Sequence, residues 1–327
     1  MPLFLDVLFL ALGFYLLAKG ADALVEGAAT IATKFGMDRW VVGLTVVAWG
    51  TSLPEIVVSS MAASADKPGQ ALGNVLGSNV ANAGLVLGTV GLILPRALVG
   101  RLSIRESAPL LASLGLLWWM LGDGVVTRVE GAVLLALFIA YTLELILLRG
   151  RNNQSTPAEL DDTETHATHP WLRTIGGSAA IALAANLVIR GANGLAESFG
   201  LDDGFVGIVI FAVGTSLPEL AAGVASARKG QAEIGLGNVV GSNVFNTLAV
   251  VGIASLVAPF GGPGLGPENS DAWTLSLSQA MSRDLPVNLA FALMLILGPP
   301  IFRGRMARPR AASLLAAWIA YAVWIGF

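Results

Sequence analysis

The six residues Gly-Thr-Ser-Leu-Pro-Glu occur at positions 50–55 and again, unchanged, at positions 214–219. A second block follows each copy, GNVLGSNV at 73–80 and GNVVGSNV at 237–244, with one difference between them. Both pairs of blocks are separated by 164 residues, and residues 43–95 align with 207–259 without a gap, with 22 identities in 53 positions. Self-similarity at a fixed offset indicates an internal duplication, so the chain consists of two related halves.

The composition is that of a membrane protein. The chain is 55% hydrophobic and only 13% charged, with a mean hydropathy of +0.73, whereas soluble domains have about a quarter charged residues. Its apolar runs are nearly continuous, which favours membrane helices over the alternating strands of a barrel. The sequence predicts an all-α polytopic membrane protein with ten transmembrane helices, at 3–33, 41–65, 70–94, 107–121, 125–148, 171–198, 205–227, 232–258, 282–302 and 310–327.

Ten spans divide into five per half, and this odd number has a consequence for the topology. A duplicated unit with an odd number of spans enters the membrane in opposite directions in its two copies. We therefore expect two inverted five-helix repeats, at 1–149 and 171–327, joined by a polar linker at 150–170. Transporters with inverted repeats bind their substrates near the middle of the bilayer, between the repeats.

The basic residues predict the orientation of the chain in a cell (inner) membrane. If both termini lie outside, the cytoplasmic loops hold 14 of the 19 Lys and Arg residues, in agreement with the positive-inside rule. The 150–170 loop is then cytoplasmic. It is acidic and contains His166 and His169, and we interpret it as a solvated linker rather than a metal-sensing loop, because it has no ordered ligand spacing.

The repeated blocks place one carboxylate deep inside a span in each half, Glu55 and Glu219. A carboxylate inside a membrane is costly and is a functional hypothesis by default. Pro54 and Pro218 precede the glutamates, and a proline frees backbone carbonyl oxygens in the preceding turn. Neutral oxygens at i, i+4 spacing surround the two carboxylates, from Thr51, Thr215, Ser78, Asn82, Ser242 and Asn246.

These donors are all oxygen atoms, and a hard cation such as Ca²⁺ takes about 6–8 oxygen ligands. Two negative charges suit one divalent ion or a few monovalent ions. Alternatively, the prolines and the Ser and Asn residues only shape and join helices, but that interpretation leaves two buried carboxylates unexplained. The other acidic residues within spans, Asp22, Glu26 and Glu144, do not recur in the other half, and we expect them at helix interfaces or at the membrane surface.

The sequence GTSLPE followed by GN-x-x-GSN, present twice, resembles the paired alpha-repeats of the cation/calcium exchanger superfamily, specifically its prokaryotic sodium/calcium exchanger type. The resemblance covers essentially the whole chain. It implies a secondary antiporter that exchanges Na⁺ for Ca²⁺ by alternating access, with these ions as transported substrates and with no organic cofactor. It further implies that Glu55 and Glu219 are the central ligands, completed by Thr51, Ser52, Thr215, Ser216, Ser78, Asn82, Ser242 and Asn246 and by the carbonyls of Ala48 and Ala212.

One position departs from part of that family. Potassium-dependent members carry Asp where this chain has Asn246, so we expect exchange without K⁺. The alternative within transport is a proton-coupled antiporter for Ca²⁺ or another divalent cation. A channel and an intramembrane enzyme fit less well, and we expect no enzymatic activity. The expected partners are inorganic cations and the lipid bilayer, without nucleic acid and without an obligate protein partner.

Overall fold

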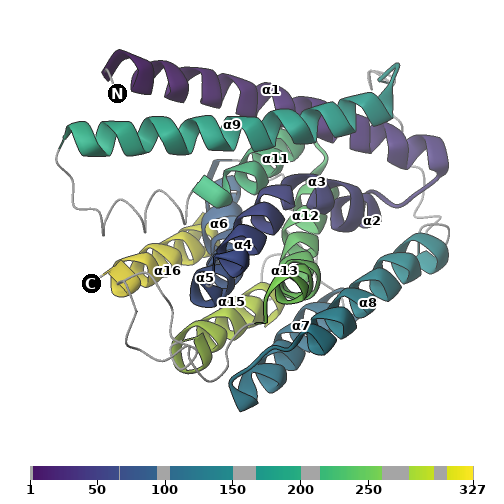
Figure 1. Ribbon diagram of the computed structural model, residues 1–327. Helices are drawn as coiled ribbons and strands as arrows, with labels where there is room; N and C mark the ends of the chain where they lie inside the picture. Colours follow the sequence, from purple (N-terminus) through teal and green to yellow (C-terminus); the bar gives the residue numbers. More distant parts are fainter. Residues whose placement is uncertain are drawn as a thin grey trace.

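The computed structural model describes residues 3–65, 67–93, 104–149, 167–199, 214–259, 280–297 and 308–326, and every regular element in these ranges is a helix. The all-α fold class is therefore confirmed (Figure 1). The first half contains α1 (Leu3–Phe35), α2 (Arg39–Val42), η1 (Gly43–Val47), α3 (Ala48–Thr51), α4 (Leu53–Ser64), α5 (Pro68–Ala81), η2 (Asn82–Val86), α6 (Leu87–Ile93), α7 (Ile104–Met120), η3 (Leu121–Asp123), α8 (Arg128–Glu144) and η4 (Leu145–Arg149). The second half contains α9 (Pro170–Ser198), α11 (Leu217–Arg228), α12 (Ala232–Phe245), η5 (Asn246–Val250), α13 (Val251–Val257), η7 (Ala280–Asp284), α15 (Leu285–Leu297) and α16 (Arg308–Gly326).

Each of the ten predicted spans overlaps at least one of these helices. Within the described ranges, five helices are long and apolar enough to cross a membrane. A sixth span is possible if the segments Arg39–Thr51 and Leu53–Ser64, which are bent by 48° at their junction, cross as one. The count of ten membrane crossings stays a prediction.

The duplication extends to the bounds of the helices. The elements α4, α5, η2 and α6 of the first half have the same lengths as α11, α12, η5 and α13 of the second, and every bound is shifted by 164 residues. Sequence identity between these segments is concentrated in the two repeated blocks, yet the helices begin and end at equivalent positions throughout. The two halves therefore share one local structure.

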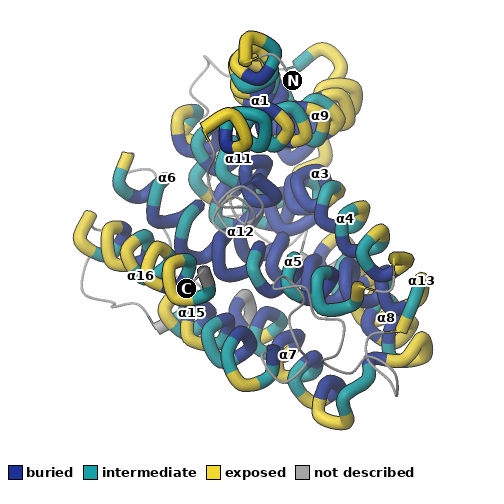
Figure 2. The backbone as a smooth tube through the Cα atoms, turned by 60° about the vertical axis from the view of Figure 1, so that its left-hand side comes forward, coloured by how far each residue is buried: buried dark blue, intermediate teal, exposed yellow. Residues whose placement is uncertain are grey.

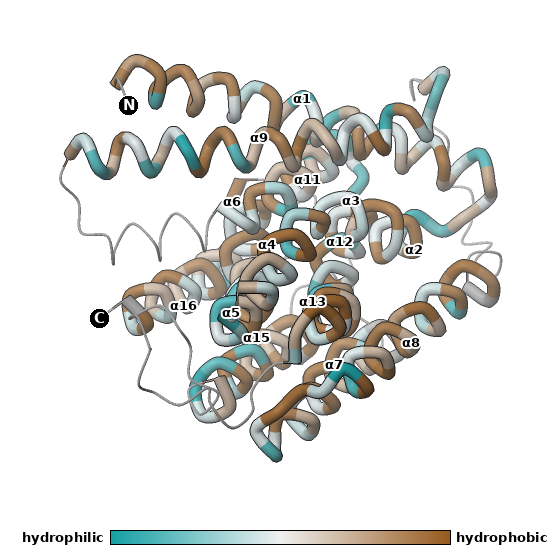
Figure 3. Tube along the Cα trace, in the orientation of Figure 1, coloured by the Kyte–Doolittle hydropathy of each residue, from teal (hydrophilic) through white to brown (hydrophobic). Residues whose placement is uncertain are grey.

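The two central helical segments, Pro68–Ile93 and Ala232–Val257, are the most deeply buried of the long apolar helices. Figure 2 shows buried backbone gathered around α5 and α12, with exposed residues on the peripheral helices α1, α9 and α16. The peripheral surface is apolar: α8 alone exposes Val129, Val133, Leu137, Ile139 and Leu143, and Figure 3 shows hydrophobic residues along much of α1 and α8. A soluble protein rarely exposes so much apolar surface, whereas lipid solvates it.

The two longest helices, α1 and α9, lie side by side and antiparallel along one face of the molecule (Figure 1). Glycines allow their backbones to approach: a Cβ atom on Gly13 would lie 2.7 Å from a methyl carbon of Val188, and one on Gly177 would lie 2.6 Å from the backbone nitrogen of Leu24. Gly13 and Gly177 are 164 residues apart in sequence, as are Leu24 and Val188. The contact is thus made twice, with the roles of the two helices exchanged, and small residues at the interface suit packing within a membrane.

Candidate functional site

Each repeated GTSLPE block contains a break between two helical segments, and the break sets the position of its glutamate. In the first half α3 ends at Thr51, Ser52 has φ −90° and ψ 10°, and α4 begins at Leu53. Ser216 has nearly the same backbone angles, φ −91° and ψ 3°, directly before α11. Pro54 and Pro218 lie in the first turn of the new helices, where the missing N–H costs no intrahelical bond. The predicted interruption of the helix by proline is confirmed, with its break at the serine.

The two glutamates that follow these breaks are fully buried, with 0% of either residue exposed. Ser78 donates a hydrogen bond to Oε1 of Glu55 over 3.4 Å, and Ser52 donates to Oε1 of Glu219 over 3.1 Å. The second oxygen, Oε2, of each glutamate accepts no hydrogen bond from the described residues. No Lys, Arg or His in the described ranges forms an ion pair with either one. A buried carboxylate without compensation costs several kcal/mol, so these oxygens require a cation or a proton.

The hydroxyl groups that the sequence predicted around the glutamates are brought together across the two halves. The hydroxyl oxygens of Thr51 and Ser242 lie 3.4 Å apart, and those of Ser78 and Thr215 lie 3.3 Å apart. These two contacts are equivalent under the 164-residue offset, and all four residues are buried. Each half therefore completes the set of oxygen atoms around the carboxylate of the other half.

Asn82 and Asn246 are the first residues of η2 and η5, which are π-helical turns inside otherwise α-helical spans. Short π-helical segments occur frequently at functional sites. The Nδ2 atom of Asn82 donates to Oδ1 of Asn243 over 3.1 Å, and Nδ2 of Asn246 donates to Oδ1 of Asn79 over 3.2 Å. The Oδ1 atoms of Asn82 and Asn246 are buried, and neither accepts a hydrogen bond within the described ranges.

Sequence reasoning did not select Asn79, Asn243 or Asn238 as site residues. Asn238 accepts from the hydroxyls of Thr51 and Ser242, over 3.1 and 3.4 Å. All three asparagines lie within the repeated GN-x-x-GSN block, and their presence in both halves is the signal that would have found them.

The remaining predicted residues have different environments. The carbonyl of Ala48 is buried and accepts the backbone N–H of Ser52 over 3.0 Å and the hydroxyl of Thr51 over 3.4 Å. The hydroxyl of Ser216 is buried and has no hydrogen-bond partner among the described residues. Ala212 lies outside the described residues.

The chemistry of the site follows from its free oxygen atoms. Two carboxylate oxygens, two amide oxygens and one hydroxyl are buried without a described hydrogen-bond donor, and they belong to Glu55, Glu219, Asn82, Asn246 and Ser216. Calcium is coordinated by carboxylate, carbonyl and hydroxyl oxygens in flexible geometry, so this set of donors fits a hard cation. The two carboxylates balance the charge of one divalent ion.

Comparison with known proteins places the chain in a family. Residues 5–147 and 169–327 match the protein family that is described as "sodium/calcium exchanger protein". CaxA of Alkalimonas amylolytica is 38% identical over 259 residues, which cover 77% of this chain and 81% of CaxA. The inner membrane protein YrbG of Escherichia coli (strain K12) is 32% identical over 327 residues, which cover 97% of this chain and 96% of YrbG.

Solved structures agree with the sequence comparisons. A structure of the sodium-calcium exchanger NCX_Mj, soaked with 2.5 mM Na⁺ and 0.1 mM Sr²⁺, matches with a TM-score of 0.76 and 28% identity. The match covers 97% of this chain and 98% of that chain. The likeness therefore extends over both repeats and both glutamate-bearing blocks, and the chain belongs to the sodium/calcium exchanger family of membrane transporters.

Proposed function

We propose that this protein is a secondary antiporter that exchanges Na⁺ for Ca²⁺ across the membrane, without K⁺. The observation that carries the proposal is the pair of buried carboxylates, Glu55 and Glu219, each with one oxygen that accepts no hydrogen bond from the described residues. Membership of an exchanger family supports transport rather than enzymatic catalysis. Both Na⁺ and Ca²⁺ are hard cations that the same oxygen atoms can coordinate in turn, as exchange at one site requires.

In this proposal the ligands are the residues predicted from the sequence. Glu55 and Glu219 supply the charge that the transported ions share. The hydroxyls, amides and carbonyls of both halves supply the neutral oxygens, from Thr51, Ser52, Thr215, Ser216, Ser78, Asn82, Ser242, Asn246, Ala48 and Ala212. The hydrogen bonds among these side chains, three of which cross between the halves, support this set, because they link seven of its eight hydroxyl and carboxylate side chains, all but Ser216.

The two halves, 1–149 and 171–327, are proposed to be inverted five-helix repeats, with the linker 150–170 between them. The reciprocal contacts of Gly13 and Gly177 support an inverted relation, since α1 and α9 are equivalent in sequence and run antiparallel. In such an arrangement the long α1–α9 pair moves against the remaining helices and exposes the site to each side in turn. The termini are proposed to lie outside an inner membrane, and the similarity to YrbG, an inner membrane protein, supports the choice of membrane.

The coupling ion is the finer part of the proposal. NCX_Mj is a sodium-calcium exchanger, and its resemblance to this chain supports Na⁺ over protons. Asn246 supports independence from K⁺, because an amide in place of a carboxylate leaves only two negative charges for the ions.

The experiment that tests the proposal uses purified protein in proteoliposomes loaded with Na⁺. Uptake of ⁴⁵Ca²⁺ is measured after dilution into Na⁺-free buffer, with K⁺ varied, and again with a proton gradient in place of the Na⁺ gradient. We expect uptake that follows the Na⁺ gradient and does not change with K⁺. Uptake that follows the proton gradient and ignores Na⁺ would establish the proton-coupled alternative instead.

A further inference from the structure

Four buried asparagines join the two halves next to the proposed cation site. Asn82 of the first half donates to Asn243 of the second, and Asn246 of the second donates to Asn79 of the first. These two hydrogen bonds are equivalent under the 164-residue offset. We refer to Asn79, Asn82, Asn243 and Asn246 as the asparagine interlock.

The interlock fixes the direction of two amide groups. The Nδ2 and Oδ1 atoms of an asparagine diverge from one carbon atom, so a hydrogen bond that holds Nδ2 also sets the direction of Oδ1. The acceptors are the Oδ1 atoms of Asn79 and Asn243, and a flipped amide on Asn82 or Asn246 would bring two oxygen atoms together. The Oδ1 atoms of Asn82 and Asn246 are thereby turned away from the interlock, and they accept no hydrogen bond within the described part of the chain.

Asn79 and Asn243 are themselves held in place. Nδ2 of Asn79 donates to the hydroxyl of Thr247 over 3.0 Å, and that hydroxyl donates to the carbonyl of Asn243 over 2.8 Å. Nδ2 of Asn243 donates to the backbone carbonyl of Asn79 over 3.2 Å. Every Nδ2 atom in the interlock is therefore used, and only the two outward Oδ1 atoms remain free.

We propose that Asn79 and Asn243 are positioning residues, which orient the amide oxygens of Asn246 and Asn82 toward the transported cation. The proposal rests on the proposed function, because it assumes that these two oxygens bind the ion. Partners that orient a ligand typically change metal affinity by about 10- to 100-fold when they are removed. The offset of the two halves further requires that Asn79 acts through Asn246 and that Asn243 acts through Asn82.

The test is ⁴⁵Ca²⁺ binding to the full-length protein in detergent, for Asn79→Ala, Asn246→Ala and the double variant, with thermal stability measured in parallel. We expect each single variant to weaken binding by about tenfold or more and the double variant to be no weaker than Asn246→Ala, because interacting residues are not additive. Asn79→Ala combined with Asn82→Ala, which are not bonded partners, should show multiplied losses. The control is Asn288→Ala, which removes another buried asparagine that donates to Leu76 and Asp284 carbonyls, and which should change stability without changing affinity.

The outcomes distinguish the positioning role of Asn79 from the ligand role of Asn246. If Asn246→Ala weakens Ca²⁺ binding but Asn79→Ala does not, the positioning role is wrong and the ligand set stands. If the losses of Ca²⁺ affinity caused by Asn79→Ala and Asn246→Ala multiply fully in the double variant, Asn79 acts independently of Asn246 and the proposal is also wrong. If Asn246→Ala leaves binding unchanged, both the ligand assignment and the positioning role fail.

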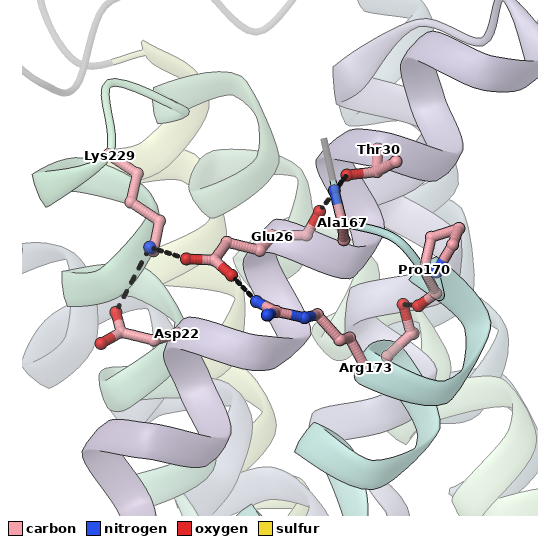
Figure 4. A network of polar contacts seen from close by, with 8 residues as sticks. Asp22, Glu26, Thr30, Ala167, Pro170, Arg173 and Lys229 are labelled. Carbon is pink, nitrogen blue, oxygen red and sulfur yellow. Dashed lines mark hydrogen bonds and ion pairs between the residues drawn. The ribbon is translucent and has the colours of Figure 1, made fainter. Parts of the chain in front are cut away.

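A second, independent observation concerns the far end of α11, the helix that contains Glu219 in its first turn. Lys229 follows the last turn of α11, and its Nζ atom lies 2.7 Å from Oε1 of Glu26 and 3.8 Å from Oδ1 of Asp22, both on α1 (Figure 4). Arg173 of α9 forms an ion pair with the other oxygen of Glu26. Figure 4 shows Glu26 between the two cations, so one carboxylate joins α1, α9 and α11.

The geometry points to a conformational latch, formed by Lys229, Glu26 and Asp22, that holds the α1–α9 pair against α11 on this side of the molecule. If α1 slides along the other helices, as the proposed function requires, these ion pairs must break. The equivalents of Lys229 and Glu26 in the other half are Ala65 and Arg190, which cannot form the same pair. The latch therefore stabilises the conformation seen here relative to the opposite conformation of the proposed transport cycle, in which the two halves have exchanged their arrangements.

The latch can be tested by labelling an introduced cysteine instead of by measuring transport. The chain contains no cysteine of its own that would react with the label. Ala225 of α11 is buried in a cluster with Leu24 and Val25 of α1, and Ala225→Cys reports when the two helices separate. We expect Lys229→Gln in this background to increase the rate of maleimide labelling about two- to fivefold, as the loss of partly exposed ion pairs implies. The matched control is Arg228→Gln, the same charge change on an exposed neighbour.

An unchanged labelling rate in Lys229→Gln, or an equal increase in Arg228→Gln, would overturn the latch. Neither result would bear on the proposed exchange of Na⁺ for Ca²⁺, which the uptake assay tests separately.

Discussion

The hydroxyl of Ser52, in the first repeated block, donates a hydrogen bond to Oε1 of Glu219, in the second, over 3.1 Å. Its equivalent, Ser216, has a buried hydroxyl with no partner among the described residues, and Glu55 is bonded by Ser78 instead. The two halves are therefore alike in helix bounds and backbone angles but differ in how they bond the carboxylates. A transporter with two related halves needs such an asymmetry, because each conformation favours one half over the other.

The carboxylates give the most direct prediction. Glu55→Gln and Glu219→Gln each preserve size and an oxygen for hydrogen bonding but remove one of the two negative charges. The pair that is broken is the one between a carboxylate and the transported cation. Removing one partner of a buried ion pair costs about 3–5 kcal/mol, so we expect exchange to fall by more than about 100-fold in either variant. The measurement is ⁴⁵Ca²⁺ uptake driven by Na⁺, with Glu144→Gln, an exposed glutamate at the end of α8, as the control. Normal flux in either site variant would refute the assignment of the site.

Asn246→Asp changes the charge of the site in the opposite direction. The third carboxylate increases the attraction for a divalent ion, and affinity for Ca²⁺ rises with the number of charged ligands. We expect Ca²⁺ to bind at least about tenfold more tightly, with slower release and slower exchange. Calorimetric titration with Ca²⁺ measures the change, and Asn186→Asp, which adds the same charge to an exposed position of α9, is the control. Unchanged binding of Ca²⁺ in Asn246→Asp would contradict a ligand role for this residue, whereas weaker binding would show that the new carboxylate is repelled by Oδ1 of Asn79.

Much of the fold could be predicted because membrane helices are encoded by local composition. Long apolar runs predicted the helices, and the 164-residue repeat predicted which of them are equivalent. The π-helical turns at Asn82 and Asn246 could not be predicted, because a π-turn differs from an α-turn by one residue of register and leaves the apolar pattern intact. Pro54 indicated a disturbed turn in this block, but its position alone could not show that the break falls at Ser52, with the proline in the first turn of the next helix.

The sequence predicted which residues form the site, but not which of them form hydrogen bonds with one another. Spacing of four residues showed that Thr51 and Glu55 share a face, yet it could not show that Ser52 bonds to the glutamate of the other half. Partners across the halves depend on the packing of α3, α4, α11 and α12, which is a tertiary property. The same reason explains why Asn79 and Asn243 were missed: their side chains act on residues of the opposite half.

The asymmetry between Ser52 and Ser216 predicts unequal effects on stability. A buried hydrogen bond to a neutral carboxyl group contributes about 0.5–1.5 kcal/mol, so Ser52→Ala should lower the Tm in Na⁺-free and Ca²⁺-free buffer. Ser216→Ala removes a hydroxyl without a described partner and should leave that Tm nearly unchanged. Both variants should slow exchange, because in the proposed transport cycle the two serines exchange roles. Equal losses of Tm in the two variants would contradict the bonding seen here.

The packing of α1 against α9 predicts that two adjacent glycines differ sharply. A Cβ atom on Gly177 would lie 2.6 Å from the backbone nitrogen of Leu24 and 2.7 Å from the carbonyl oxygen of Gly20, and backbone atoms cannot move aside without separating the helices. A Cβ atom on Gly176 meets no described atom within 4 Å. Gly177→Ala should therefore destabilise the pair by about 1–3 kcal/mol, the usual cost of overpacking, and should slow exchange, while Gly176→Ala is neutral or slightly stabilising because alanine favours helix. Thermal unfolding in detergent and Na⁺-driven Ca²⁺ uptake measure the two effects, and equal behaviour of the two variants would show that the close approach of α1 and α9 is not needed for transport.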